Sequence, residues 1–230
     1  MRNIIKKIST ALICVFAILF IKGCRKDFSA TAEHKASYGW EMYETSDYLK
    51  SKEWFTNSVL TNEEWKDGYN GLGWSYAKLL ELDSLDTENI GAIRTFHRGL
   101  LQPKDPWNST DIHLEILAGL AFAYHAKGKS SEVVKFGSAL IDSTLIGINP
   151  SRWHSWAFSH DSTLNYLDLR ITMASSYFAL AKFDSTNKHL KVVLDSLGSS
   201  NLLISDYSSL LGRQKVAQQL DSLQKVLQQK

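Results

Sequence analysis

The run from Tyr69 to Tyr76 constrains the fold more than any other stretch of the chain. Tyr69, Leu72 and Tyr76 recur at steps of three and four residues, which places them on one face of a helix. Gly73 lies on the same face, and a glycine in mid-helix costs about 1 kcal/mol relative to alanine. That cost predicts a paired helix that approaches Gly73 very closely.

This run has an earlier counterpart in the chain. Gly39 precedes Gly73 by 34 residues, and a tryptophan follows each glycine. Self-similarity at a fixed period of about 20–50 residues is typical of stacked helical repeats. Two further copies of the apolar pattern follow, one from about Thr110 and a weaker one around Tyr177. We therefore predict an all-α fold of about four helix pairs.

The regions of the chain differ in polarity and periodicity. We predict a signal peptide over residues 1–23, a tether over 24–31, a helical repeat domain over 32–198 and a C-terminal capping helix over 199–230. The last helix has an apolar stripe at steps of four, three and four residues: Val216, Leu220, Leu223 and Leu227. A solenoid needs a terminal helix with a polar outer face. A helix that forms a coiled coil with a partner is the alternative.

The first residues have the pattern of a secretory signal. Arg2, Lys6 and Lys7 precede an apolar run from Ile8 to Ile21, and no acidic residue interrupts this segment. A basic start, a short apolar run and a small residue are typical of a cleaved signal. The run is too short to span a bilayer comfortably.

The sequence Ile21-Lys22-Gly23-Cys24 resembles the lipobox of bacterial lipoproteins. The resemblance implies that Cys24 becomes the lipidated first residue, which would anchor the protein to a membrane of the bacterial cell envelope. The outer membrane, on its periplasmic or surface side, is the expected location. The alternative is an uncleaved N-terminal anchor, and both interpretations tether the chain to a membrane.

Removing the signal changes the charge and the cysteine count. The signal contains four basic residues and no acidic ones. Because the whole chain has a net charge of +2, the remainder carries −2. No basic footprint for nucleic acid remains. Cys14 lies in the signal and Cys24 would carry lipid, which leaves no thiol pair for a disulfide or a cysteine-based metal site.

Three short motifs point to a family. The runs are Tyr69–Tyr76, which contains Gly-Leu-Gly-Trp, then Gly119–Tyr124, which reads Gly-Leu-Ala-Phe-Ala-Tyr, and Phe158 with His160 and Asp161. With these motifs the chain resembles the tetratricopeptide-repeat superfamily, and more narrowly its bacterial envelope lipoproteins. The resemblance covers most of the chain after the signal. It implies a right-handed solenoid that binds proteins or peptides, with no enzymatic activity and no cofactor.

In such repeats the first helix of each pair lines a concave face. The resemblance implies that the residue after each Gly or Ala position points into that face, with a second residue three positions on. The predicted binding residues are Trp40, Tyr43, Asn70, Trp74, Phe122, His125 and Phe178. Aromatic side chains provide large contact areas at low entropic cost. In the alternative interpretation, the same aromatics pack on a long loop.

That loop spans about Thr144 to Thr163. It contains Trp153, His154, Trp156, Phe158, His160 and Asp161. Loops of this length are uncommon in a compact array and are often functional, so we predict a lid or a plug. Its histidines and aspartate could suggest a metal ion, but zinc sites usually have tighter or paired spacings and a fourth ligand.

Catalytic motifs are absent from the sequence. Gly71 and Gly73 lack the third glycine of a dinucleotide-binding loop, and no phosphate loop or serine elbow occurs. The leading hypothesis is a non-enzymatic, lipid-anchored scaffold that binds another envelope protein or peptide through the concave face. The alternative is a glycan-binding lipoprotein for nutrient uptake or cell-wall contact. A third is an enzyme that uses the histidines and aspartate of the loop.

Overall fold

The computed structural model describes residues 29–83, 90–103, 110–147, 156–198, 203–204 and 206–229. The chain divides into two compact units, Met1–Ala30 and Thr31–Lys230, and the fold below is that of the second. The predicted lipidation site Cys24 and the loop residues Trp153 and His154 lie outside the described residues. Within those residues, no helix combines the length and the hydropathy that a membrane span requires.

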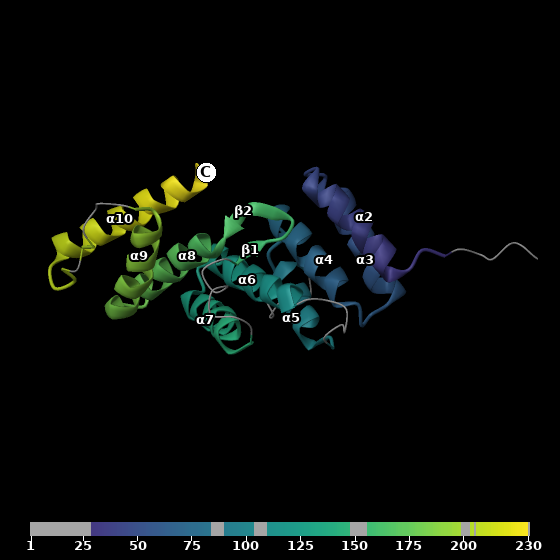
Figure 1. The fold of residues 1–230 in the computed structure, drawn as a ribbon, viewed down its shortest axis with the longest axis horizontal. Helices are drawn as coiled ribbons and strands as arrows, with labels where there is room; N and C mark the ends of the chain where they lie inside the picture. Colours follow the sequence, from purple (N-terminus) through teal and green to yellow (C-terminus); the bar gives the residue numbers. More distant parts are fainter. Residues whose placement is uncertain are drawn as a thin grey trace, which may run out of the picture. The chain divides into compact units, whose positions relative to one another are not determined.

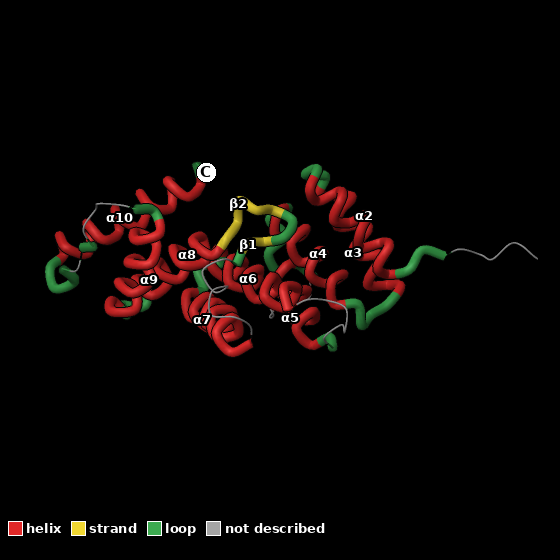
Figure 2. Tube along the Cα trace, viewed as in Figure 1, coloured by secondary structure: helices red, strands yellow, loops and turns green. Residues whose placement is uncertain are grey.

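Helices dominate the second unit (Figure 1; Figure 2). They are α2 (Ala32–Glu44), α3 (Tyr48–Thr61), α4 (Lys66–Lys78), α5 (Ala92–Leu101), α6 (Thr110–Ala126), α7 (Ser130–Gly147), α8 (Tyr166–Ala179), α9 (Phe183–Ser196) and α10 (Leu210–Gln228). Two short strands, β1 (Ala157–Phe158) and β2 (Asp161–Asn165), pair antiparallel. The predicted all-helical character is confirmed for the described residues, apart from this hairpin.

The hairpin corrects the prediction of a loop from Thr144 to Thr163. Helix α7 continues to Gly147, and the residues from Ala157 onward form β1 and β2. The strands are too short for their periodicity to stand out in the sequence. Side-chain contacts with α2, α4 and α6 hold them in place.

The helices pack in a pattern that recurs along the chain. Each of α2, α4, α6 and α8, named here the first helices, packs against the helix that follows it. The second helix of each pair packs against the next first helix. The first helices also contact one another in order, and α8 contacts α10. This consecutive packing is compatible with a repeat solenoid.

Each first helix ends in the same kind of turn. Ser46, Leu80, Gly128 and Ala181 have φ angles between 55° and 68°. In every turn the N–H of that residue donates to the carbonyl three residues earlier, and the next N–H donates to the carbonyl five residues earlier. These bonds satisfy carbonyl groups that the end of a helix leaves unpaired. Glycine, which adopts this conformation most easily, occupies the position only at Gly128, and no glycine marks the other three turns.

Leu80 provides a test of this turn. A left-handed conformation costs a non-glycine residue roughly 1–2 kcal/mol, and the Leu80 side chain is 81% exposed. Part of the gain from glycine is lost because glycine has more freedom in the unfolded chain. We expect Leu80→Gly to raise the free energy of unfolding by about 0.5–1 kcal/mol, measured by urea denaturation. The matched change Gly128→Ala should lower it, and a loss of stability in Leu80→Gly would contradict the argument.

Glycines on the first helices make room for aromatic rings of the second helices. A Cβ atom at Gly73 would lie 2.5 Å from Cδ1 of Phe96 in α5, and a Cβ at Gly119 in α6 would lie closer still to the same ring. Phe55 of α3 occupies the equivalent place one pair earlier. Its ring lies against Gly39 of α2 and Gly71 of α4. The prediction that a paired helix approaches Gly73 closely is therefore confirmed.

Helix α10 packs through its predicted stripe. Val216, Leu220, Leu223 and Leu227 are buried in one cluster with apolar residues of α8 and α9. Most of the remaining side chains of α10 are exposed. The stripe thus covers the apolar side of the last helix pair in the described part of the chain.

Candidate functional site

The hairpin segment, defined as residues 156–165, lies against the first helices α2, α4 and α6 (Figure 1). Phe158 pairs with Asp161 across the strands, and Ser159 and His160 form the turn between them. The N–H of Tyr166 donates to the carbonyl of Trp156 at 2.8 Å, which ties the segment to the start of α8. The side chains of four consecutive residues, Phe158 to Asp161, then contact the helices.

Phe158 fills a pocket made by three aromatic side chains. Its ring stacks on Trp74 with centroids 4.3 Å apart, and it meets the edges of Trp40 and Tyr43 at 5.9 Å each. Only 1% of Phe158 is exposed. We call Trp40, Tyr43 and Trp74 the aromatic pocket. Stacked and edge-to-face contacts of this kind add to the free energy of area burial.

His160 covers the other side of the pocket. Its ring is parallel to that of Trp40, at a centroid distance of 3.6 Å. Nδ1 of His160 lies 2.9 Å from Oε1 of Glu44, and because a carboxylate only accepts, the imidazole is the donor. The indole N–H of Trp40 donates to Asp67 at 3.0 Å, so hydrogen bonds orient both stacked rings.

A buried carboxylate binds the turn of the hairpin segment. Glu115 of α6 accepts hydrogen bonds on Oε1 from the backbone N–H of Ser159 at 3.1 Å and from its hydroxyl at 2.5 Å. On Oε2 it accepts from the side-chain amide of Asn70 at 2.6 Å. Both Glu115 and Asn70 are almost completely buried. The carboxylate is thus shared between a helix and the hairpin segment.

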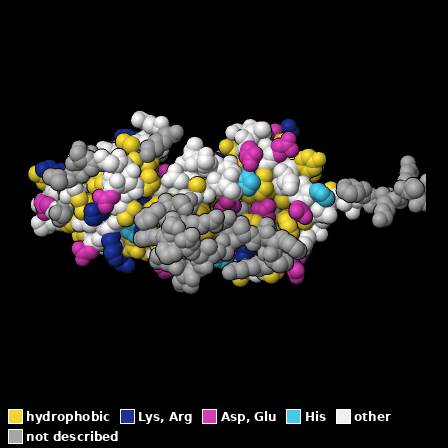
Figure 3. Space-filling view, in the orientation of Figure 1, with side chains coloured by type: hydrophobic (Ala, Val, Ile, Leu, Met, Phe, Trp, Pro, Cys, Tyr) yellow, Lys and Arg dark blue, Asp and Glu magenta, His cyan; other side chains and the backbone are white. Residues whose placement is uncertain are grey.

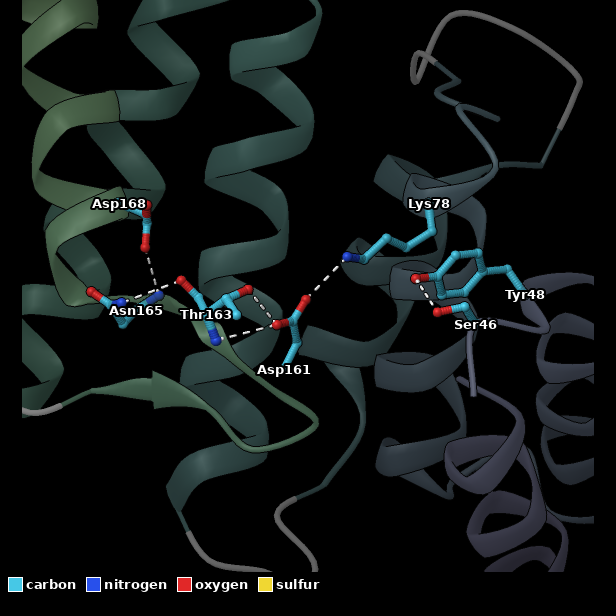
Figure 4. Close-up of polar contacts among 7 residues, drawn as sticks. All are labelled: Ser46, Tyr48, Lys78, Asp161, Thr163, Asn165 and Asp168. Carbon is cyan, nitrogen blue, oxygen red and sulfur yellow. Dashed lines mark hydrogen bonds and ion pairs between the residues drawn. The ribbon is translucent and has the colours of Figure 1, made fainter. Parts of the chain in front are cut away.

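Asp161 forms an ion pair with Lys78 at the end of α4 (Figure 4). The Nζ–Oδ2 distance is 3.1 Å, and the other carboxylate oxygen accepts from the N–H and hydroxyl of Thr163. Burial alone would raise the pKa of Asp161, but the hydrogen bonds from Thr163 and Lys78 together hold the pKa below its ordinary value. The Lys78 ammonium also lies over the rings of Tyr43 and Tyr48, at 5.8 Å from each.

Burial dominates the electrostatics of Glu115. Loss of solvent raises the pKa of Glu115, and the donors Ser159 and Asn70 and the nearby His160 offset only part of this rise. The folded protein therefore binds this proton more tightly than the unfolded chain does. The corresponding stability is fully present below the unfolded pKa, and it is lost as the pH rises through the folded pKa.

The variant Glu115→Gln tests the direction in which the stability contributed by Glu115 changes with pH. Glutamine keeps an acceptor for Ser159 and does not titrate. We expect the wild type to gain stability relative to the variant as the pH falls from about 7 toward the ordinary glutamate pKa. Urea denaturation of both proteins across this range measures the difference, with the exposed glutamate change Glu53→Gln as control. A difference that stays constant with pH would contradict the assigned burial effect.

The structure places the predicted binding residues in three settings. Trp40, Tyr43 and Trp74 come together as the aromatic pocket, and Asn70 lies beside them as the partner of Glu115. Phe122 is half-buried with its ring 6.4 Å from that of Trp74, and His125, whose pKa burial lowers, lies farther along α6. Phe178 belongs to a separate cluster with α10. The aromatic pocket is occupied by the hairpin segment.

The predicted loop residues in the described part of the chain fall into a buried group and a polar group. Trp156 and Phe158 are buried, whereas His160 and Asp161 bind Glu44 and Lys78 at the edge of the segment. Within the described part of the chain, no three His, Cys, Asp or Glu side chains gather as a metal ion would require. In the space-filling view, acidic and basic side chains both occur on the described part of the face shown (Figure 3).

Several residues of the site were missed by the sequence reasoning. Glu115 is the most informative, because it is a single acid in the apolar stretch from Ile112 to Leu117 of α6. Such a charge on the buried side of a helix needs a partner, and this could have marked it. Glu44, Lys78 and Ser159 carry no comparable signal.

Neither the models of known protein families nor the curated proteins gave a match to this chain.

Proposed function

We propose that this protein is a non-enzymatic scaffold of the bacterial cell envelope that binds an extended segment of another protein on its first helices. The four consecutive hairpin residues held by three of these helices carry the proposal. Phe158 enters the aromatic pocket, Ser159 binds Glu115, His160 stacks on Trp40, and Asp161 pairs with Lys78. This is how a groove recognises a peptide, by a pocket for one side chain and polar contacts beside it.

The finer fold assignment is part of the proposal. The recurring helix packing, the four equivalent turns and the glycine-to-aromatic contacts support a right-handed solenoid of the tetratricopeptide type with α10 as its cap.

The lipid anchor is also part of the proposal. It is supported by the basic and apolar start of the chain followed by Cys24. Cys24→Ser should release the protein from the membrane fraction, and a variant that stays membrane-bound would argue for an uncleaved anchor.

Protein binding is favoured over glycan binding. Sugars stack on exposed aromatic faces, but the rings of Trp40 and Trp74 are stacked against His160 and Phe158. Both tryptophans are at most 6% exposed. The occupant of the aromatic pocket is itself a stretch of polypeptide, bound through Phe158 and the backbone N–H of Ser159, which favours a protein segment over a sugar.

Photo-crosslinking in living cells tests the scaffold role. A photoreactive residue replaces Glu44, whose side chain is 54% exposed beside the hairpin segment. Matched probes replace Leu60 on α3 and Gln218 on α10. We expect one protein to be captured at position 44 and at neither control, with the crosslink mapped to an extended stretch. Capture equal at all three positions, or none at position 44, would reject the proposal.

A further inference from the structure

We infer that the hairpin segment is an intramolecular ligand that competes with a partner segment of the same chemistry for the aromatic pocket. This partner segment has an aromatic residue, then a residue with a free N–H, then a flat hydrogen-bond donor, then an acid. The inference rests on the proposed function and specifies its partner. Each part of it follows from one contact of residues 158–161.

The first position must be aromatic. Three rings surround Phe158 and leave 1% of it exposed, so an aliphatic side chain would forgo the stacking on Trp74. The second position must donate, because the Glu115 carboxylate accepts from the N–H and the hydroxyl of Ser159. A proline there would leave the buried carboxylate without its backbone donor.

The third and fourth positions are polar. The flat imidazole of His160 lies on Trp40 and donates to Glu44, a combination that a histidine or an arginine can provide. The fourth position faces Lys78, whose ammonium lies near two tyrosine rings and pairs with Asp161. An aspartate or glutamate fits there.

The hairpin segment depends on this contact for its structure. Its first strand has two residues, and an isolated two-stranded hairpin is at best marginally stable in water. The segment therefore folds as it docks, as a bound peptide does. Because it is part of the same chain, it competes at an effective concentration in the millimolar range.

The intramolecular ligand also leaves polar groups in and beside the aromatic pocket unsatisfied. Among the described residues, no hydrogen-bond partner is found for the buried hydroxyl of Tyr43, the indole N–H of Trp74 or the amide oxygen of Asn70. Buried polar atoms without partners oppose binding. A partner segment with further polar groups at the pocket gains over the hairpin segment at these three atoms.

The test uses a labelled peptide with the sequence of residues 156–165 and the full-length chain. The released variant combines Phe158→Ala with His160→Ala, which weakens the intramolecular ligand and leaves the pocket intact. By fluorescence anisotropy, we expect the peptide to bind the released variant about tenfold more tightly than the wild type, or better. A peptide carrying Phe158→Ala should bind neither protein. Equal binding, or no binding, by a released variant with wild-type helical circular dichroism overturns the inference.

A second variant covers the case in which the released variant does not fold. Asp161→Asn removes only the ion pair with Lys78, and it should increase peptide affinity by a smaller factor than the double change. No increase for this folded variant overturns the inference. Lys78→Ala in the same background should weaken the wild-type peptide more than a peptide carrying Asp161→Asn, because only the former pairs with Lys78.

The two proposals fail in different ways. Peptide binding without any crosslinked partner in cells would keep the intramolecular ligand and remove the scaffold role. A partner captured at position 44, with no peptide binding to the released variant, would keep the scaffold and remove the competition.

Discussion

Replacing Phe96 with alanine is expected to lower the free energy of unfolding by about 3–5 kcal/mol, measured by urea denaturation. Phe96 is completely buried, and its ring lies where α4, α5 and α6 meet. The backbone at Gly73 and Gly119 has no side chain that could move into the space the ring leaves. The cavity would therefore persist, and persistent cavities account for the upper part of this range.

A second change at Gly73 makes the test of Phe96 specific. In the wild type, Gly73→Ala should destabilise the protein, because its Cβ would lie 2.5 Å from the ring. In the Phe96→Ala background the same methyl enters the cavity and should restore part of the lost stability. The half-buried Phe183, which stacks on Tyr207, is the control, and Phe183→Ala should cost less than half as much. Equal losses at both phenylalanines would contradict the assignment.

Replacing Phe158 with alanine is expected to be the second largest change, with a loss of about 3 kcal/mol. The loss has an upper limit, because once the hairpin segment leaves the pocket nothing further is lost there. Trp40 and Trp74 would then face water, so tryptophan emission should shift to the red while helical circular dichroism is kept. Ser162→Ala, an exposed change in the same hairpin segment, is the control. Unchanged emission and unchanged stability in Phe158→Ala would show that the segment contributes nothing to the fold.

The helix pairs could be predicted because their signals are local. The steps of three and four residues from Tyr69 to Tyr76 indicate one helical face, and the glycines indicate where an aromatic ring of the paired helix approaches. The turns were harder, since Leu80 and Ala181 adopt positive φ angles without the glycine that usually marks them. There the repeated hydrogen-bond pattern of the helix end overrides the preference of the residue.

The hairpin segment could not be predicted because its structure comes from distant residues. The two residues of β1 carry no periodicity, and the side chains that hold the hairpin segment come from α2, α4 and α6. The aromatic residues of the pocket were found from the repeat, and the alternative that they pack on the long loop agrees with the contacts of Phe158 and His160, but the hairpin form of that loop was not predicted. Glu115 was not predicted because its hydrogen-bond partners, Asn70 and Ser159, lie more than 40 positions away in the sequence.

The span of these contacts has a consequence for how the chain folds during synthesis. An array of helix pairs is nearly one-dimensional, so each pair can form as it emerges from the ribosome. The bond between His160 and Glu44 instead joins residues 116 positions apart, and the pair of Lys78 and Asp161 spans 83. The earliest helices of the array thus remain incomplete until residues 158–161 have been made. The hairpin segment can therefore close over them only after most of the array has been made, and its contacts join helices of separate pairs.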